Sequence, residues 1–390
     1  MSGASPIAAF YTPLKHPFQE EASGDRQIGL ALMDALRAAG YEPELASRFQ
    51  SWRRAFDAED AERLERAAAF VVETLVRRYR RRSPEGRPRF WMTYQNYYRC
   101  PDLLGPAVAT ALDIPYVLAS TAVSRSSRRS PFRAWVSAAR LAARRADLIF
   151  AMSPRDVPGL ASLRGSCFAA SRLLLLPPAV DLNRFQASRQ GRNACRADLA
   201  RHFSASDGPL CLCVASMRVA DKLDSYRLLA EALTRLSTER RARPWRLLVV
   251  GDGPARPAVE AAMATLPAER ICLAGALDPT ALPPLYLGAD LFVFPGVGED
   301  FGMVYLEAAA AGLPTVACLG PGPDFAVAPG GGILTEPTPR AFAEGLGSLL
   351  DDPERRERMG AAALQFVASE RSLELFRRRL AEGLGRLDLP

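Results

Sequence analysis

Two glutamates, Glu299 and Glu307, lie eight residues apart in the stretch GEDFGMVYLEAAAAG. The pattern predicts a glycine-containing loop and then a helix that ends at Gly312. The first backbone N–H groups of this helix, at Gly302 and Met303, favour negative charge. Glu299 could contact sugar hydroxyls or stabilise positive charge on a reacting carbon, and Glu307 could bind a ribose. The alternative is that Glu299 is only an acidic residue at the start of the helix and that Glu307 is a solvated helix residue. The alanines around Glu307 nevertheless indicate an apolar face.

Two basic residues four positions apart follow a predicted strand at 209–216, in the stretch MRVADK. Arg218 could grip two oxygens of a diphosphate, and Lys222 could add a mobile point charge. Solvated basic residues near a turn are the alternative interpretation.

A glycine turn, GDGPAR, follows the next predicted strand at 245–253. Gly251, Asp252 and Gly253 could let a flat ring or a phosphate approach the backbone, or could simply form a tight turn.

The loop after the first predicted strand leads through Ser23 and Gly24 into a helix, which gives a second candidate anion site. Histidine occurs only as His16 and His202, and neither lies in a nucleophile–base pattern. We expect no dedicated metal site, because the sequence has no HxH, CxxC or DxD motif.

Short apolar runs alternate with helical patterns, which predicts parallel sheets covered by helices on both faces. The helix at 130–146 is expected to begin at Ser130, with Pro131 at its first position. A polar segment near 182–208 separates two strand–helix series, and the part after about 340 is expected to be helical. Ligands of such sheets bind beyond the carboxyl ends of the strands. The predicted strands are 6–11, 88–94, 114–120, 147–153, 173–181, 209–216, 245–253, 270–276, 289–296 and 314–318.

The 390 residues are enough for two domains, and no apolar run is long enough to cross a membrane. The N-terminus lacks a signal pattern, and the seven scattered cysteines favour reduced thiols in the cytoplasm. Residues 1–185 hold 27 Lys and Arg against 18 Asp and Glu, a net charge of +9, whereas 186–390 hold 23 against 25. The basic half suggests an anionic partner.

Five motifs in chain order resemble those of the retaining glycosyltransferases of the GT-B fold, in particular glycosyltransferase family 4. The resemblance is strongest over about 177–325. It implies an α/β chain of two doubly wound, Rossmann-like domains that face a cleft: 1–185 on the acceptor side, 186–365 for the nucleotide sugar, and a last helix at 366–390 that packs back on the first domain. The motifs are PPAVDLNRF (177–185), ASMRVADK (215–222), VVGDGPAR (249–256), LPPLYLGADLFVFPGVGEDFGMVYLEAAAAGLPTVA (282–317) and GPGPDFAVAPGGGIL (320–334).

The resemblance also implies roles for site residues. Glu299 would contact the transferred sugar and Glu307 the ribose, while Arg218 and Lys222 would neutralise the departing diphosphate. The remaining donor-binding residues would be Gly24, Gly251, Asp252, Gly253, Phe301, Gly302 and Met303, with no metal and no cofactor beyond the donor. The sequence departs from the family pattern where a cleft histidine is common, near Thr121, and His16 is a weak substitute.

We therefore predict a metal-independent retaining transferase that moves a sugar from a nucleoside diphosphate to a glycan, lipid-linked or small-molecule acceptor. The alternative is a catalytically silent GT-B protein that binds a nucleotide sugar or scaffolds partners. A phosphorylase or epimerase on the same fold is disfavoured. No residue pattern indicates a lysine that binds pyridoxal phosphate, and only two lysines are present to supply one. The arginines of 77–82 and 125–145, with Phe132 and Trp135 among them, suggest a cytoplasmic protein held on an anionic membrane, or a solvated helix face. No nucleic-acid-binding module is recognised.

Overall fold

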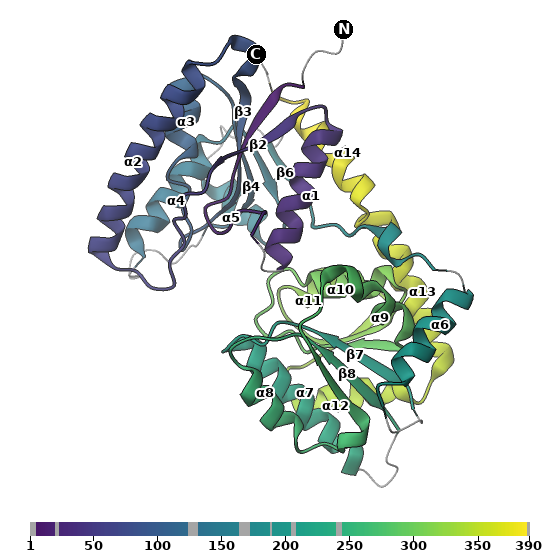
Figure 1. Cartoon of the computed structure of the whole chain (residues 1–390). Coiled ribbons are helices and arrows are strands. Elements are labelled where there is room, and N and C mark those ends of the chain that lie inside the picture. The colour runs from purple at the N-terminus through teal and green to yellow at the C-terminus, as the bar shows by residue number, and fades with distance from the viewer. Residues whose placement is uncertain are drawn as a thin grey trace. The chain divides into compact units, whose positions relative to one another are not determined.

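The structure is a computed structural model that describes residues 5–19, 23–123, 132–163, 172–187, 189–203, 208–238 and 244–387. The chain divides into two compact units (Figure 1). The first comprises Met1–Pro178 with Glu374–Pro390, and the second comprises Ala179–Leu373, whereas the sequence predicted divisions after residues 185 and 365.

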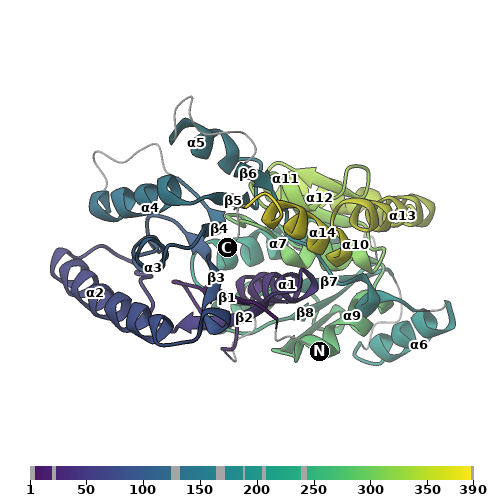
Figure 2. The ribbon, with the colours of Figure 1, turned by 90° about the horizontal axis from the view of Figure 1, so that it is seen from above.

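The first unit is built on a six-stranded parallel sheet in the order β2-β1-β3-β4-β5-β6. Its strands are β1 (Ile7–Tyr11), β2 (Glu42–Ser47), β3 (Pro88–Asn96), β4 (Tyr116–Thr121), β5 (Leu148–Ala151) and β6 (Leu173–Leu175). Its helices are α1 (Gly24–Ala38), α2 (Ala58–Arg80), α3 (Gly105–Leu112), α4 (Arg133–Arg145), α5 (Asp156–Leu163) and α14 (Leu373–Leu384). Figures 1 and 2 show α2, α3 and α4 on one face of the sheet and α1 and α14 on the other.

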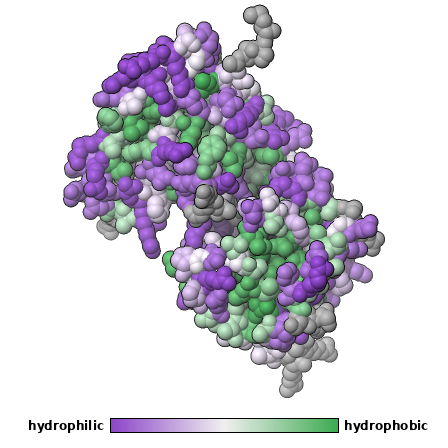
Figure 3. Space-filling model, viewed as in Figure 1, coloured by the Kyte–Doolittle hydropathy of each residue, from purple (hydrophilic) through white to green (hydrophobic). Residues whose placement is uncertain are grey.

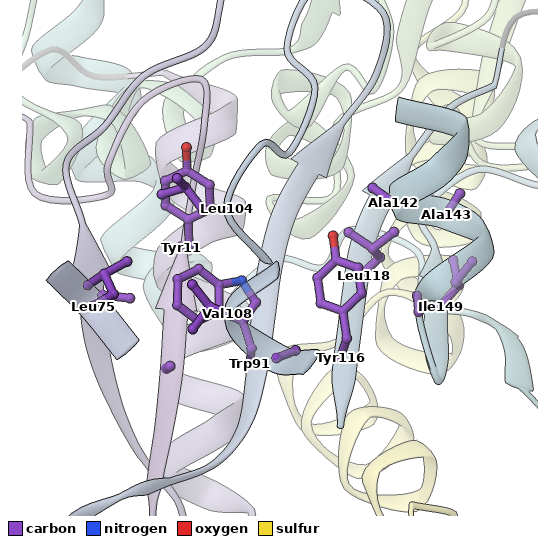
Figure 4. Close-up of a cluster of buried hydrophobic side chains, with 14 of the residues drawn as sticks. Tyr11, Leu75, Trp91, Leu104, Val108, Tyr116, Leu118, Ala142, Ala143 and Ile149 are labelled. Carbon is purple, nitrogen blue, oxygen red and sulfur yellow. The ribbon is translucent and has the colours of Figure 1, made fainter. Parts of the chain in front are cut away.

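Apolar side chains from both layers fill the space between this sheet and helices α2 to α4 (Figure 4). Tyr11 and Trp91 are fully buried on neighbouring strands, with ring centroids 5.8 Å apart. Leu75 on α2 and Val108 on α3 pack in the same cluster. On the opposite face, α14 lies so close to β5 that a Cβ on Gly383 would sit 2.5 Å from the Phe150 ring. The C-terminal helix is thus part of the first unit.

The second unit has its own six-stranded parallel sheet, in the order β12-β11-β10-β7-β8-β9. Its strands are β7 (Leu210–Val214), β8 (Arg246–Val250), β9 (Ile271–Gly275), β10 (Leu291–Val293), β11 (Thr315–Cys318) and β12 (Gly332–Thr335). Its helices are α6 (Arg189–Ala200), α7 (Asp221–Thr238), α8 (Arg256–Met263), α9 (Leu282–Gly288), α10 (Met303–Ala310), α11 (Pro323–Ala326), α12 (Pro339–Leu350) and α13 (Pro353–Glu370). Short 3₁₀ turns lie at Pro84–Gly86, Leu182–Phe185, Ala268–Arg270 and Pro279–Ala281.

These two sheets confirm the predicted doubly wound α/β architecture and every predicted strand. Two strands were missed because their sequences lack a strand pattern: β2 is the polar run EPELAS, and β12 begins at the last of three consecutive glycines. Helix α4 begins at Arg133 with Phe132 in the capping position, later than predicted. The expected cap residues Ser130 and Pro131 lie outside the described residues.

The strand order of each sheet reverses at one point, between β1 and β3 in the first unit and between β7 and β10 in the second. At such a switch point the two loops at the carboxyl ends of the strands diverge and leave room for a ligand. The residues that follow β1, β3, β7 and β10 are therefore placed to form sites.

The loops after β7 and β8 are joined through their backbones. Met217 N donates to Asp252 O, and Ala255 N donates to Met217 O, both at 2.8 Å. Gly251 makes this approach possible, because it has a φ of +149° and a Cβ there would overlap the carbonyl oxygen of Ala215.

Replacing Gly251 with alanine should therefore destabilise the second unit by about 2 kcal/mol more than a glycine-to-alanine change that meets only backbone strain. Gly330 is the matched control, since its φ is +71° but its Cβ would have no neighbour closer than 4.0 Å. Amide hydrogen exchange in β7 and β8 at increasing urea concentrations measures both costs. Equal costs for Gly251→Ala and Gly330→Ala would contradict the steric argument.

Candidate functional site

Two of the predicted site residues meet at the switch point of the second unit. Lys222 is the second residue of α7, and Glu299 lies in the loop between β10 and α10. The Lys222 Nζ forms an ion pair with Glu299 Oε2, although 77 residues separate them in sequence. About four fifths of each side chain is buried, with 20% of Lys222 and 19% of Glu299 exposed. The lysine Nζ also lies 4.9 Å from the centre of the Phe294 ring.

Hydrogen bonds from two different segments hold the loop that carries Glu299. Gly322 N donates to the backbone oxygen of Glu299 at 2.7 Å, and Val297 N donates to Ser225 Oγ at 2.9 Å. Ser225 belongs to α7 and donates its own hydroxyl to the backbone oxygen of Asp221. The helix that carries the lysine therefore also holds the loop that carries the glutamate.

Glu307 is buried, with 4% of its surface exposed, so the interpretation of a solvated helix glutamate is wrong. Its Oε2 accepts a hydrogen bond of 2.9 Å from the hydroxyl of Tyr286 on α9. Burial raises the pKa of Tyr286 well above its usual value, and the charge of Glu307 adds to that increase. A carboxylate is costly to bury unless its oxygens are hydrogen-bonded. The tyrosine on α9 therefore compensates part of this cost and holds the carboxylate of α10 in a fixed orientation.

Helix α10 begins beside the Glu299 loop. Met303 is its first residue, and Gly302 occupies the capping position with a φ of +64° and no side-chain cap. Tyr305, in the first turn, donates its hydroxyl to the backbone oxygen of Phe294 at 3.1 Å. The partly buried Phe301 immediately precedes this start. The predicted helix start after Glu299 is thereby confirmed.

The other predicted donor residues of this unit have local partners. Arg218 is exposed, and its Nε donates to Ser216 Oγ at 3.1 Å. Asp252 accepts a hydrogen bond from its neighbour Gly253 N, and this bond is the largest cause of the lowered pKa of Asp252. Arg256 also pairs with Asp252, at 3.1 Å. The structure thus joins Lys222 to Glu299 directly and records no such contact between Arg218 or Asp252 and this pair within the described residues.

In the first unit, the predicted Gly24 is the first residue of α1, and Ser23 caps that helix by accepting a 3.2 Å hydrogen bond from Arg26 N. Thr121, which stands near the family histidine, is buried at the end of β4. Its hydroxyl donates to Asn96 O and accepts from Asn96 Nδ2, each at 2.8 Å. His16 lies in the loop after β1, and burial and the charge of Arg48 lower its pKa.

Within the described ranges, no cluster of three or more His, Cys, Asp or Glu residues could hold a metal ion. In the same ranges, no helix is long and apolar enough to span a membrane. Four of the six described cysteines are buried, and all six are free thiols.

Sequence reasoning missed the residues that support this site, namely Tyr286, Ser225 and Tyr305. Ser225 follows Lys222 by three residues on the same helix, so its helical position was a usable signal. Tyr286 comes 21 residues before Glu307 on a different helix, and no sequence spacing indicates that contact.

Residues 208–352 match the family model described as Glycosyl transferases group 1. The D-inositol 3-phosphate glycosyltransferase of Kineococcus radiotolerans is 32% identical over 237 residues, which cover 54% of this chain and 53% of that protein. A GDP-mannose-dependent alpha-(1-6)-phosphatidylinositol monomannoside mannosyltransferase of Mycolicibacterium smegmatis is 30% identical and covers 53% of this chain and 54% of its own length. The chain therefore spans about half the length of the curated relatives it matches.

The fold can be compared over nearly the whole chain. The solved structure of sucrose-phosphate synthase from Thermosynechococcus elongatus superposes with a TM-score of 0.73 at 20% identity and covers 98% of each chain. At this identity the likeness concerns the fold alone. The match to the group 1 glycosyltransferase model lies within the second unit, and over nearly its whole length the chain has the GT-B fold.

Proposed function

We propose that the protein is a retaining glycosyltransferase that transfers a sugar from a nucleoside-diphosphate sugar to a hydroxyl group of an acceptor. The observation that carries this proposal is the Lys222–Glu299 ion pair at the switch point between β7 and β10. A carboxylate and an ammonium this close together can bind the two groups that the breaking bond joins. The carboxylate would bind the sugar, and the ammonium would bind the diphosphate.

In this proposal the donor displaces the contact between the two side chains. Lys222 moves to a phosphate oxygen, and Arg218 turns from Ser216 to bind a second one. Glu299 then accepts hydrogen bonds from hydroxyls of the transferred sugar. Glu307 accepts hydrogen bonds from the ribose, while the Tyr286 hydroxyl keeps its carboxylate oriented. Phe301, Gly302 and Met303 present the N-terminal backbone of α10 to the donor.

The reaction follows from these positions. The bond between the sugar C1 and the diphosphate oxygen breaks, and negative charge grows on the diphosphate, where Arg218 and Lys222 stabilise it. The acceptor hydroxyl attacks C1 from the same face, so the configuration is retained. Its proton passes to the departing phosphate oxygen, which makes a separate protein base unnecessary. Glu299 favours the positive charge that develops on the sugar ring.

Thermal stabilisation and donor hydrolysis across UDP-, GDP- and ADP-sugars test this function. One donor should stabilise the wild type by mass action and be hydrolysed slowly. Glu299→Ala should reduce turnover by about 100-fold or more, because it removes a group that acts on the charge formed in the transition state. Glu307→Ala should weaken donor binding about tenfold through the loss of hydrogen bonds to a charged group.

Glu344→Ala is the control, since Glu344 is an exposed α12 residue paired with Arg340. Stabilisation of the wild type by a donor, without turnover of any donor, would favour a catalytically silent nucleotide-sugar-binding protein. No stabilisation by any of the donors would contradict the proposed function.

The acceptor is proposed to be a glycan, a lipid-linked sugar or a small polyol. This class is supported by the activities for which the two relatives are named, which concern inositol 3-phosphate and a phosphatidylinositol monomannoside. We also propose that the protein works in the cytoplasm and associates peripherally with the inner face of an anionic membrane.

Membrane association is proposed through the C-terminal end of α2. Arg77, Arg80 and Arg81 are exposed there, and Figure 3 displays hydrophilic residues gathered over the α2 side of the first unit. Phe132 and Trp135 do not belong to this surface, because both are buried. Their rings pack in a cluster with Phe56 and Tyr98. Charge, rather than aromatic insertion, is therefore the proposed source of membrane affinity.

The triple variant Arg77→Glu, Arg80→Glu, Arg81→Glu should bind vesicles of phosphatidylglycerol and phosphatidylcholine at least about 100-fold more weakly than the wild type. The reason is that each arginine near an anionic surface contributes about 1 kcal/mol. Cosedimentation measures the difference. A second-unit triple at the exposed Arg235, Arg340 and Arg358 makes the same charge change and should keep most of the affinity. An equal loss in both triples would show that net charge alone is responsible.

A further inference from the structure

Backbone hydrogen bonding joins the two segments through which the chain enters and leaves the second unit. The chain enters this unit after Pro178 and leaves it after Leu373. Just inside these crossings, Val180 and Ser372 form a parallel β-bridge, and Val180 N donates to the backbone oxygen of Arg371 at 2.9 Å. Arg371 is also the C-terminal capping residue of α13. Its backbone is therefore fixed at the place where the chain connects the two units.

The Arg371 side chain contacts two aromatic rings. Its guanidinium carbon is 4.4 Å from the centre of the Phe325 ring and 5.0 Å from that of the Phe366 ring. Nη2 donates to the backbone oxygen of Phe325 and Nη1 to that of Glu370, both in long hydrogen bonds of 3.4 Å. Only 8% of Arg371 is exposed, so the cation–π contacts are largely desolvated and correspondingly strong. One side chain thus joins α11, which carries Phe325, to α13, which carries Phe366.

An apolar side chain could fill this position at a lower cost. A guanidinium is expensive to bury because it loses hydration, and a methionine of similar length would avoid that penalty. Helix α11 has only four residues, Pro323–Ala326, and a single helical turn is not stable without packing partners. The property that distinguishes arginine here is that its plane binds a ring and a carbonyl oxygen of α11 at the same time. Arg371 is therefore suited to hold this short helix.

Helix α11 in turn contacts the loop of Glu299. Gly322, the residue before α11, donates its N–H to Glu299 O at 2.7 Å, and its own carbonyl accepts from Phe325 N at 3.1 Å. The approach is close, since a Cβ on Gly322 would lie 3.0 Å from Glu299 Cγ. A displacement of α11 would therefore move both the backbone and the side chain of Glu299. Contacts run without interruption from Arg371 through Phe325 and Gly322 to the proposed catalytic carboxylate.

We propose that Arg371 is a positioning residue for sugar transfer, an inference that rests on the proposed transferase function. Arg371 holds α11, and α11 holds the Glu299 loop in the place where its carboxylate acts on the transferred sugar. The proposed donor-binding residues Lys222 and Glu307 belong instead to α7 and α10. Loss of the Arg371 contacts should therefore lower kcat and leave donor affinity nearly unchanged.

Amide hydrogen exchange at single residues tests the proposed contact without any need for activity. In Arg371→Met, the Gly322 N–H that donates to Glu299 O should exchange about tenfold faster than in the wild type, as expected for the loss of a desolvated cation–π contact. The Met217 N–H, which donates to Asp252 O in the same unit, is the internal reference. A general loss of stability would accelerate both amides equally, whereas a positioning role accelerates Gly322 alone.

Two phenylalanines provide a matched pair of variants. Phe325→Leu removes the ring on α11 and should reproduce the Gly322 acceleration, whereas Phe366→Leu removes the ring on α13 and should not. Donor hydrolysis gives the second readout. Arg371→Met and Phe325→Leu should lower kcat about tenfold and change the donor Kd by less than about twofold. Phe366→Leu should keep kcat within about twofold of the wild type. Equal effects of the two phenylalanine substitutions would contradict the route through α11.

Equal acceleration of the Gly322 and Met217 amides, or no acceleration at Gly322, would overturn the proposal. A kcat of Arg371→Met equal to that of the wild type would overturn it as well. The outcome is separable from that of the donor experiment. Wild-type turnover with an unchanged Gly322 amide in Arg371→Met rejects the positioning role alone. Acceleration at Gly322 without turnover of any donor by the wild type rejects the transferase function and keeps the link between Arg371 and the Glu299 loop.

Discussion

An ion pair across a reversal of strand order organises the second unit. Lys222 and Glu299 follow β7 and β10, which are adjacent in the sheet although they are far apart in sequence. A partly exposed pair of this kind adds little to stability, because desolvation and lost side-chain entropy offset most of the attraction. Its significance is positional: it keeps a cation and a carboxylate at the point where a doubly wound sheet receives its ligand. A bound diphosphate would compete for the lysine.

The two units use the same geometry with different chemistry. Each has a carboxylate that is held by a residue from across the switch point. Lys222 holds Glu299 in the second unit. In the first unit, Gln95 Nε2 donates to Asp25 Oδ1. A cationic partner suits a site for an anionic group such as a diphosphate, whereas an amide partner brings no charge.

The sequence was sufficient for the architecture because apolar runs and helical periodicity repeat strongly along the chain. It also singled out Glu299 and Lys222 as candidates, since their residue types and their positions after predicted strands are visible in the sequence. It could not reveal that they touch, because strand order is a property of the folded sheet. The alanines around Glu307 indicated an apolar face, but its partner Tyr286 escaped for a related reason, because it comes from another helix.

The first unit shows more clearly which features cannot be predicted from the sequence. Nothing in the sequence around Gln95 indicates its left-handed backbone, with a φ of +75°. Tyr94 Oη and Gln95 Oε1 are buried without a hydrogen-bond partner among the described residues, which only the folded chain reveals. Conversely, the arginines of the helix predicted at 130–146, with Phe132 and Trp135 among them, suggested a membrane surface, but both rings pack in a buried cluster with Phe56. The charges of a helix can be counted from its sequence. Whether a given side chain is exposed or buried depends on the elements that pack against the helix.

The most direct test of the central claim is a crystal structure of the chain with an intact nucleoside-diphosphate sugar. The account predicts that Lys222 Nζ leaves Glu299 for a phosphate oxygen and that a Glu299 carboxylate oxygen lies within hydrogen-bond distance of a sugar hydroxyl. A donor bound elsewhere, with the Lys222–Glu299 pair still intact, would contradict it.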